Sequence, residues 1–229
     1  MQSEIRHNPD AAIVHFRFDE VGEQVTTEAG AMIGCDSAVE MTTHIQGGLG
    51  GALRTKVIRQ DSLFKNVFTA TAPGQTLSIA PGSEGAIDTA TIDTDQELYL
   101  QSTSLLAWTN GVVLDTHSQR GRNIFASRAF LVRAYGRGQI WFSAHGAFYQ
   151  VEVGKEYDGY VCEAGHLVAF TSKLKLHTRR VAAIKNYFRQ GGGHLAELRG
   201  EGRVWLQTKN TTALLHFLHP FRRVGRGRD

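Results

Sequence analysis

Two pairs of residues in the sequence could serve hydrolytic chemistry. Asp115 and His117 lie two residues apart, and so do Ser143 and His145. Side chains at this spacing share one face of a strand. Neither pair lies in a G-x-S-x-G motif, and no third partner completes a Ser-His-Asp site. We therefore predict that the protein is not an enzyme.

The sequence also lacks the residue spacing that metal-binding and phosphate-binding motifs require. The chain has ten histidines but no H-x-H, H-E-x-x-H or C-x-x-C motif. The glycine-rich stretch 44–51 is followed by no Lys-Ser/Thr at Walker spacing, so we expect a flexible loop. We predict no cofactor and no metal. His166 is expected to bond to the backbone of a nearby turn, and His216 and His219 to flank the end of an apolar strand.

The cysteines and tryptophans are predicted to be structural. Cys35 and Cys162 are far apart with no metal-ligand spacing, and we expect both to be reduced and partly buried. Trp108, Trp141 and Trp205 fall in apolar strands. Exposed tryptophans could stack on bases, but apolar neighbours favour a place in the core or at a subunit interface.

Charge is distributed unevenly along the chain. Residues 1–100 carry 6 Lys+Arg and 14 Asp+Glu, whereas residues 101–229 carry 19 and 8. This asymmetry fits head-to-tail packing of copies, binding of RNA or an anionic surface by the basic half, or a solvated surface without a partner. The last ten residues, 220–229, form a flexible basic tail in which Arg222, Arg223, Arg226 and Arg228 could contact anions.

No apolar run approaches the roughly 18 residues of a membrane span. The first ten residues contain no apolar signal core. We expect a cytoplasmic protein without a transmembrane segment.

The elements that carry these residues follow a repeated phrase of a glycine turn and then a strand. Its glycines are Gly74, Gly138 and Gly202, at a constant spacing of 64 residues. A fixed spacing indicates a tandem structural repeat. A second phrase, Glu-Ala-Gly, places Gly30 and Gly165 at bends where a strand changes direction.

Short alternating strands between turns predict an all-β protein. We divide it into a loose lead-in (1–10), a single domain of three repeats (11–93, 96–153 and 156–219) and the tail. Stacking three repeats of about 60 residues would bury a shared core. The segment 178–189 is the only candidate helix, although its β-branched and aromatic residues weaken that prediction.

Several of these phrases together resemble the Altered Inheritance of Mitochondria 24 family. They include residues 28–32, 39–41, 62–64, 74–85, 165–170 and 198–208, in the same order over about residues 12–210. The resemblance implies a double-stranded β-helix or jelly-roll-like fold of three tandem units, similar to subunits of the tryptophan RNA-binding attenuation protein. It also implies trimers with a pseudo-ninefold ring, and it brings no catalytic residues.

Mitochondrial members of that family are linked to inner-membrane organisation. This chain has no mitochondrial presequence and reads Gly191-Gly192-Gly193-His194 where Gly-Glu-Gly is commoner, so we expect a prokaryotic member. The leading hypothesis is a non-enzymatic homo-oligomeric scaffold or interaction module. The alternatives are RNA or anionic-surface binding through the basic half, and small-ligand binding between protomers.

Overall fold

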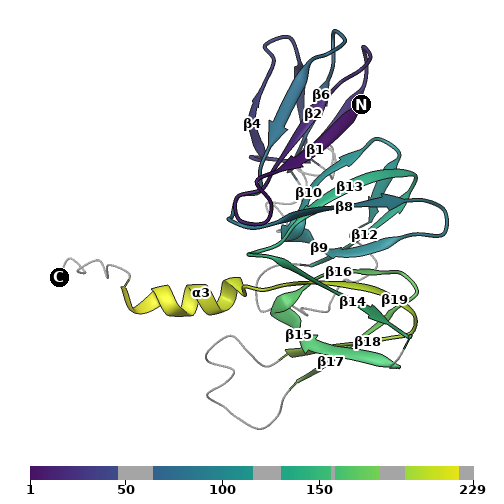
Figure 1. Ribbon diagram of the computed structural model, residues 1–229, viewed down its shortest axis with the longest axis vertical. Helices are drawn as coiled ribbons and strands as arrows, with labels where there is room; N and C mark the ends of the chain where they lie inside the picture. The colour runs from purple at the N-terminus through teal and green to yellow at the C-terminus, as the bar shows by residue number, and fades with distance from the viewer. Residues whose placement is uncertain (46–63, 116–129, 156–157, 181–193, 222–229) are drawn as a thin grey trace, which may run out of the picture.

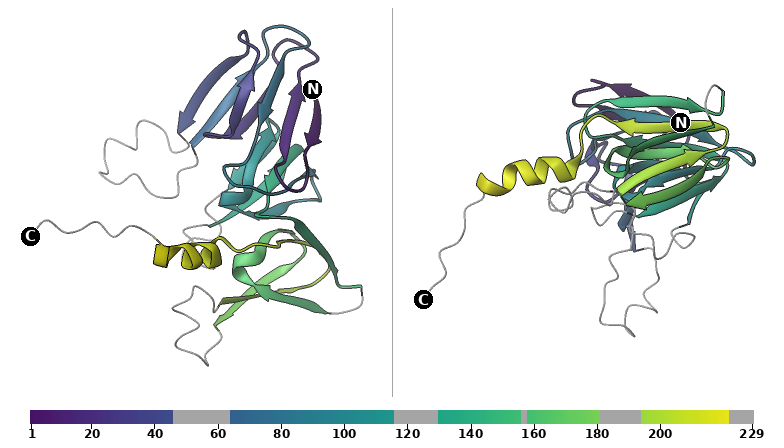
Figure 2. Two further views of the ribbon diagram at one scale, coloured as in Figure 1. Left: turned by 60° about the vertical axis from the view of Figure 1, so that its left-hand side comes forward. Right: turned by 90° about the horizontal axis from the view of Figure 1, so that it is seen from below.

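The residues that the structure describes form mainly antiparallel β-strands, arranged in four stacked sheets (Figures 1 and 2). The computed structural model describes residues 1–45, 64–115, 130–155, 158–180 and 194–221. The alternating sequence explains the strands directly. Val14, Phe16 and Phe18 are fully buried, whereas His15 and Arg17 point the other way.

The first sheet has four strands and lies at the N-terminal end of the stack (Figure 1). Its order is β1 (Gln2–Arg6), β2 (Ile13–Arg17), β7 (Thr76–Ile79) and β4 (Met32–Cys35). Residues 1–10, predicted as a loose lead-in, thus contain a strand. It forms because β1 pairs along the whole of β2 and Ile5 packs against the core.

The second and third sheets have six strands each. The second runs in the order β5 (Glu40–Ile45), β6 (Phe64–Thr69), β3 (Gln24–Glu28), β10 (Leu105–Thr109), β13 (Gly138–Ser143), β8 (Ile87–Ile92). The third runs in the order β11 (Val112–Asp115), β12 (Leu131–Gly136), β9 (Leu98–Gln101), β16 (Leu167–Thr171), β19 (Gly202–Gln207), β14 (Phe148–Val153). The two sheets have equivalent strand orders, because adding six to each strand number of the second sheet gives the order of the third.

The fourth sheet, of three strands, lies at the opposite end of the stack from the first (Figure 1). It consists of β15 (Gly159–Glu163), β18 (His194–Arg199) and β17 (Lys175–Arg180). Residues 178–180, part of the predicted helix, therefore belong to a strand, because β17 pairs with β18 as far as Arg180. Residues 181–189 of that segment lie outside the described residues.

Short helical elements complete the described part of the chain. The 3-10 turns found there, Ser102–Ser104, Ala164–His166 and His219–Phe221, precede or follow regular elements. One α-helix, α3 (Thr211–Leu218), extends away from the sheets in both views (Figures 1 and 2). The expected strand end at His216 is therefore a helix, and the residues before it form the last strand, β19.

Three apolar clusters fill the spaces between successive sheets. Phe16 and Trp141 meet between the first and second sheets, with ring centroids 4.9 Å apart and an edge-to-face angle of 82°. Phe142 and Trp205 meet in the same way between the second and third, at 5.7 Å. Leu198 and Val204 are fully buried in the cluster between the third and fourth sheets. Burial of these large side chains is the main stabilising term.

Candidate functional site

The residues first considered for catalysis do not form an assembled site where the structure describes them. Ser143 is buried, and the backbone N–H of His145 donates to Gln207 Oε1 at 3.0 Å. Burial lowers the pKa of the His145 imidazole, because the charged form loses its hydration. His117 lies outside the described residues. Within the described ranges, no group of three or more His, Cys, Asp or Glu is placed to hold a metal ion.

His166 bonds to backbone, as predicted, although to a strand and not to its own turn. Its Nδ1 lies 2.7 Å from the carbonyl oxygen of Gln207. The side-chain amide of Gln207 in turn donates to the Gly165 carbonyl at 2.9 Å. These bonds tie the 3-10 turn after β15 to β19, so His166 has a structural role.

The predicted structural glycines lie at turns and strand starts. Gly30 and Gly74 adopt φ of 91° and 82°, in the region that favours glycine. Gly138 and Gly202 are the first residues of β13 and β19. A Cβ at Gly202 would overlap the hydroxyl of Thr171, and one at Gly138 that of Thr109. A Cβ at Gly165 would meet the amide of Asn210.

The tryptophans are buried, as predicted. Trp141 is fully enclosed, and Trp108 and Trp205 are 5% exposed. Buried rings leave no face for a base to stack on, so these residues serve packing. The four arginines of the predicted anion contact, Arg222, Arg223, Arg226 and Arg228, lie outside the described residues.

The two cysteines are free and differ in environment. Cys162 is half-buried, and burial raises the pKa of its thiol to about 12. Such a thiol is a poor nucleophile because little of it is thiolate at neutral pH. Cys35, predicted to be partly buried, is exposed. It lies on β4, whose outer edge has no neighbouring strand among the described residues.

Two strands stand out because each is paired on one side only among the described residues, whereas their counterparts are paired on both sides. In the six-stranded sheets, β10 pairs with β3 and β16 with β9. By the six-strand offset, β4 corresponds to β10 and β16, and β15 corresponds to β3 and β9. Yet β4 and β15 end their sheets, and no described strand pairs with their outer edges.

The side chains on these two edges are correspondingly exposed. Met32 and Ile33 on β4 are 42% and 58% exposed, and Val161 on β15 is 43% exposed. By contrast, every residue of β10 from Leu105 to Trp108 is buried. Exposed apolar side chains on an unpaired edge mark a surface that can accept another strand. A hollow of about 340 Å³ beside β15 is lined by Tyr149, Tyr160 and Val161, among others.

The correspondence of β4 with β10 and β16 extends to local detail. Each strand has a register shift at the same place, between Met32 and Gly34 in β4 and between Leu105 and Ala107 in β10. The third shift lies between Leu167 and Ala169 in β16. The sequence signal for these edges was the repeated Glu-Ala-Gly phrase, which follows β3 and β15 and precedes β4 and β16.

Helix α3 presents a second exposed apolar surface. Leu215, Phe217 and Leu218 are 62%, 67% and 48% exposed, and Phe221 is 74% exposed. Phe217 and Phe221 contact each other, with ring centroids 5.8 Å apart. None of the described helices is long and apolar enough to cross a membrane.

Comparison with known proteins identifies the family. The sequence pattern of the family described as mitochondrial biogenesis AIM24 matches residues 3–209, which is most of the chain. The chain belongs to the mitochondrial biogenesis AIM24 family. The resemblance found in the sequence is thereby confirmed.

The fold is shared with a solved bacterial structure. The crystal structure of protein SPYM3_0169 from Streptococcus pyogenes superposes with a TM-score of 0.79 at 18% sequence identity. The match covers 96% of this chain and 99% of that protein. At this identity the likeness shows a common fold and says nothing of a common partner or ligand. No curated protein matches the chain.

Proposed function

We propose that this AIM24-family chain is a non-enzymatic, homo-oligomeric scaffold or interaction module, and that β4 of one copy pairs with β15 of the next. The supporting observation is that the outer edges of both strands have no described partner and carry exposed side chains, whereas the counterparts of these strands in the same chain pair with each other and are mostly buried. The chain consists, in this proposal, of three six-strand units of a double-stranded β-helix or jelly-roll type. Prokaryotic origin stays a prediction.

The pairing of the internal strands sets the register of this contact. Ala169 lies opposite Leu100, and Phe170 lies opposite Tyr99. The corresponding residues on the open edges are Gly34 and Cys35 of β4 and Cys162 and Val161 of β15. We therefore expect Gly34 to lie opposite Cys162, and Cys35 opposite Val161, in an antiparallel pair. The resulting sheet would have the order β17-β18-β15-β4-β7-β2, extended by β1.

The location of the two edges determines what kind of assembly follows. The sheet that carries β4 and the sheet that carries β15 lie at opposite ends of the molecule (Figure 1). Contact between different surfaces is head-to-tail, which closes a ring or continues as a filament. We favour a closed trimer, as the family resemblance implies.

Analytical ultracentrifugation at micromolar protein tests this proposal. We expect one closed oligomer whose mass is a small multiple of the 25.2 kDa chain. Sedimentation as a monomer throughout that range would contradict the proposal.

Binding of an anionic surface is the second candidate. The observation in its favour is that the exposed apolar residues of α3 are followed directly in the sequence by the four arginines of the tail. Apolar and basic residues together suit the headgroup region of anionic lipid. Vesicle co-sedimentation with and without anionic lipid tests it. Removal of residues 211–229 should abolish binding, and binding of single-stranded RNA alone would assign the tail to RNA.

A further inference from the structure

The outer face of the first sheet carries a serine where the next two sheets carry a tryptophan. Strands β7, β13 and β19 are equivalent, and each lies beside an equivalent partner, β4, β10 or β16. A register shift marks the same place in all three pairs of strands. The residues just past the shift lie opposite one another as follows: Ser78 and Gly34, Trp141 and Ala107, and Trp205 and Ala169. Ser78 therefore corresponds to Trp141 and Trp205.

Each tryptophan fills the interval between its own sheet and the sheet before it. Trp141 is fully buried and meets the Phe16 ring of the first sheet edge to face. Trp205 is buried in the same way against the Phe142 ring of the second sheet. Its Nε1 also donates to Asp88 Oδ2 at 2.9 Å. An indole ring is thus a regular part of the packing between successive sheets of this chain.

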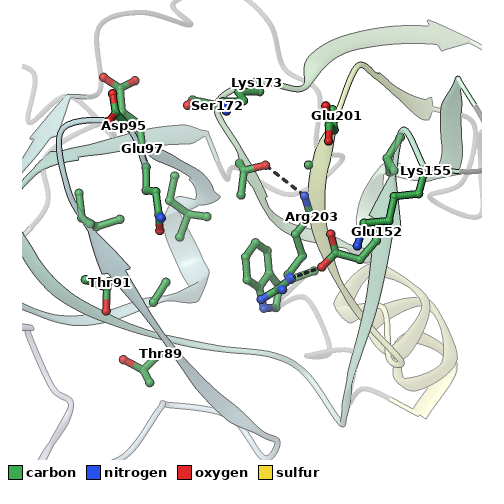
Figure 3. A pocket seen from close by; sticks show the side chains of 18 residues that line it. Thr89, Thr91, Asp95, Glu97, Glu152, Lys155, Ser172, Lys173, Glu201 and Arg203 are labelled. Atoms are coloured by element: carbon green, nitrogen blue, oxygen red, sulfur yellow. Dashed lines mark hydrogen bonds and ion pairs between the residues drawn. The ribbon is translucent and has the colours of Figure 1, made fainter.

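Arg203 completes the packing around Trp205, beside a cleft of about 540 Å³ (Figure 3). Its Cζ lies 5.5 Å from the centroid of the Trp205 ring, and its Nε donates to Glu152 at 2.6 Å. The chain itself therefore fills the indole position in the first two intervals of the stack.

Ser78 points away from the other sheets of its own chain. Its neighbours Leu77 and Ile79 belong to the cluster between the first and second sheets, and successive residues of a strand face opposite sides. In the proposed pairing of β4 with β15, Ser78 and Gly34 lie in one row with Cys162. Cys162 packs against the cluster between the third and fourth sheets. Ser78 of the copy that contributes β4 then faces the third sheet of the copy that contributes β15.

The surface that would face this serine contains a hollow. By the strand registers, Leu206 and Tyr149 correspond to Phe142 and Asp88, the two residues that contact Trp205. Leu206 and Tyr149 both line the hollow of about 340 Å³ beside β15, and Tyr149 is 56% exposed. The floor of an indole position is therefore present in one copy, without an indole above it.

The other residues of the row do not replace the missing ring. In the third sheet the row reads, strand by strand, Leu100, Ala169, Trp205 and Gln150. In the joined sheet it would read Cys162, Gly34, Ser78 and His15. The first three are smaller than their counterparts, and His15, which is similar in size to Gln150, holds its Nδ1 2.9 Å from Ser78 Oγ. Neither copy supplies a side chain for the indole position between them.

We propose that a planar ring compound of about the size of indole binds between two copies, in the space where Ser78 replaces tryptophan. The site depends on the proposed pairing of β4 with β15, because it is incomplete without the second copy. An N–H on the ring is favoured, since Tyr149 stands at the position of Asp88 and its hydroxyl can accept a hydrogen bond. Glu163 and His166 also line the hollow, so the ring can carry polar substituents.

Isothermal titration calorimetry of the assembled protein with indole, 1-methylindole and cyclohexanol tests the proposal. We expect indole to bind once per contact between copies and at least tenfold more tightly than cyclohexanol. 1-Methylindole should bind more weakly than indole, because it has no N–H to donate.

Substitutions on both sides of the contact locate the binding. Ser78→Trp should fill the space and reduce indole binding at least tenfold while assembly persists. Tyr149→Ala should have a similar effect on binding, and its exposed position should preserve the fold if Ser78→Trp does not fold. Val113→Trp is the matched control, because it adds the same ring on β11, outside the contact, and should leave indole binding unchanged.

Sedimentation of the same samples separates this site from the assembly itself. Ile33→Lys, on β4 and outside the residues that line the hollow, should separate the copies and abolish indole binding. No indole binding at millimolar concentration by a protein that sediments as an oligomer would overturn the proposed site alone. Indole binding that Ser78→Trp and Tyr149→Ala leave unchanged would do the same. Sedimentation as a monomer would overturn the pairing of β4 with β15, and the site with it.

Discussion

Gly202 shows how strongly a single residue can be constrained in this fold. It begins β19, and the Thr171 hydroxyl that accepts the Arg203 N–H at 3.1 Å occupies the space where a side chain would lie. Gly138 is placed in the same way against Thr109, which accepts the Gln139 N–H at 3.0 Å. These glycines are needed because a hydroxyl on the neighbouring strand lies against the backbone.

Gly202→Val is therefore expected to damage folding or assembly by about 3 kcal/mol or more, through overlap with Thr171. Denaturant unfolding and sedimentation measure the effect. Gly82→Val is the control, because nothing lies within 4 Å of a Cβ at Gly82. A Gly202→Val protein that folds and assembles normally but loses a binding activity would contradict the structural role.

The buried carboxyl of Glu28 should make the free energy of unfolding depend on pH. Burial raises the pKa of its carboxyl from 4.5 to about 7. The protonated form is then favoured by folding, so its stabilisation is complete below pH 4.5 and is lost as the pH rises through 7. Glu28→Gln should keep that stability, and should exceed the wild type at pH 8 by about 1–3 kcal/mol but match it at pH 4.

Chemical denaturation at the two pH values checks this expectation. The corresponding residue of the next unit, at the end of β9, is Gln101, which is buried and uncharged. Glu40→Gln, at an exposed position, is the control and should change neither value. Equal stability of wild type and Glu28→Gln at pH 8 would show that the carboxyl is not buried as described.

At the scale of elements, the proposed association of copies depends on the two open strands, β4 and β15. Val161→Lys places a charge in the middle of the β15 edge and should block pairing with β4. Its side chain is 43% exposed, so the monomer fold should survive. Light scattering with size-exclusion chromatography should show a smaller species than wild type, with an unchanged circular-dichroism spectrum.

Val113→Lys provides the matched control for that variant. Val113 is 47% exposed on β11, an edge strand outside the proposed contact. It should assemble as the wild type does. If Val161→Lys also assembled normally, β15 would not be the contact strand.

The sequence predicted the type of most secondary-structure elements, but not which strands lie beside one another. The short alternating strands between turns correctly indicated an all-β protein. The helix α3 was missed because its apolar run, Ala213 to Leu218, is short enough to suit a strand or a helix. The exposure of Cys35 was missed because burial on a strand depends on which neighbour it has, and that information is not local.

The candidate sites show the same limit. The repeated Glu-Ala-Gly phrase located the ends of β3 and β15, but only the sheet order reveals that the outer edge of β15 has no partner among the described strands.

At the scale of the whole molecule, we propose that one chain is an open segment of a longer stack of sheets. The last half-sheet of one copy, β15-β18-β17, and the first of the next, β2-β7-β4, would together form another six-stranded sheet. Closure after a few copies would leave no open edge of this kind. The most direct evidence would be a covalent link at the expected register.

That link can be made with one new cysteine. Opposite residues of antiparallel strands have Cα atoms about 4.5–5.5 Å apart, within the range that a disulfide spans. In a Cys162→Ser background, Val161→Cys should therefore oxidise with native Cys35 of a neighbouring copy. Non-reducing electrophoresis should show covalent dimers and trimers that disappear when Cys35→Ser is added. An assembled protein that remains entirely monomeric on that gel would contradict the proposed pairing of β4 with β15.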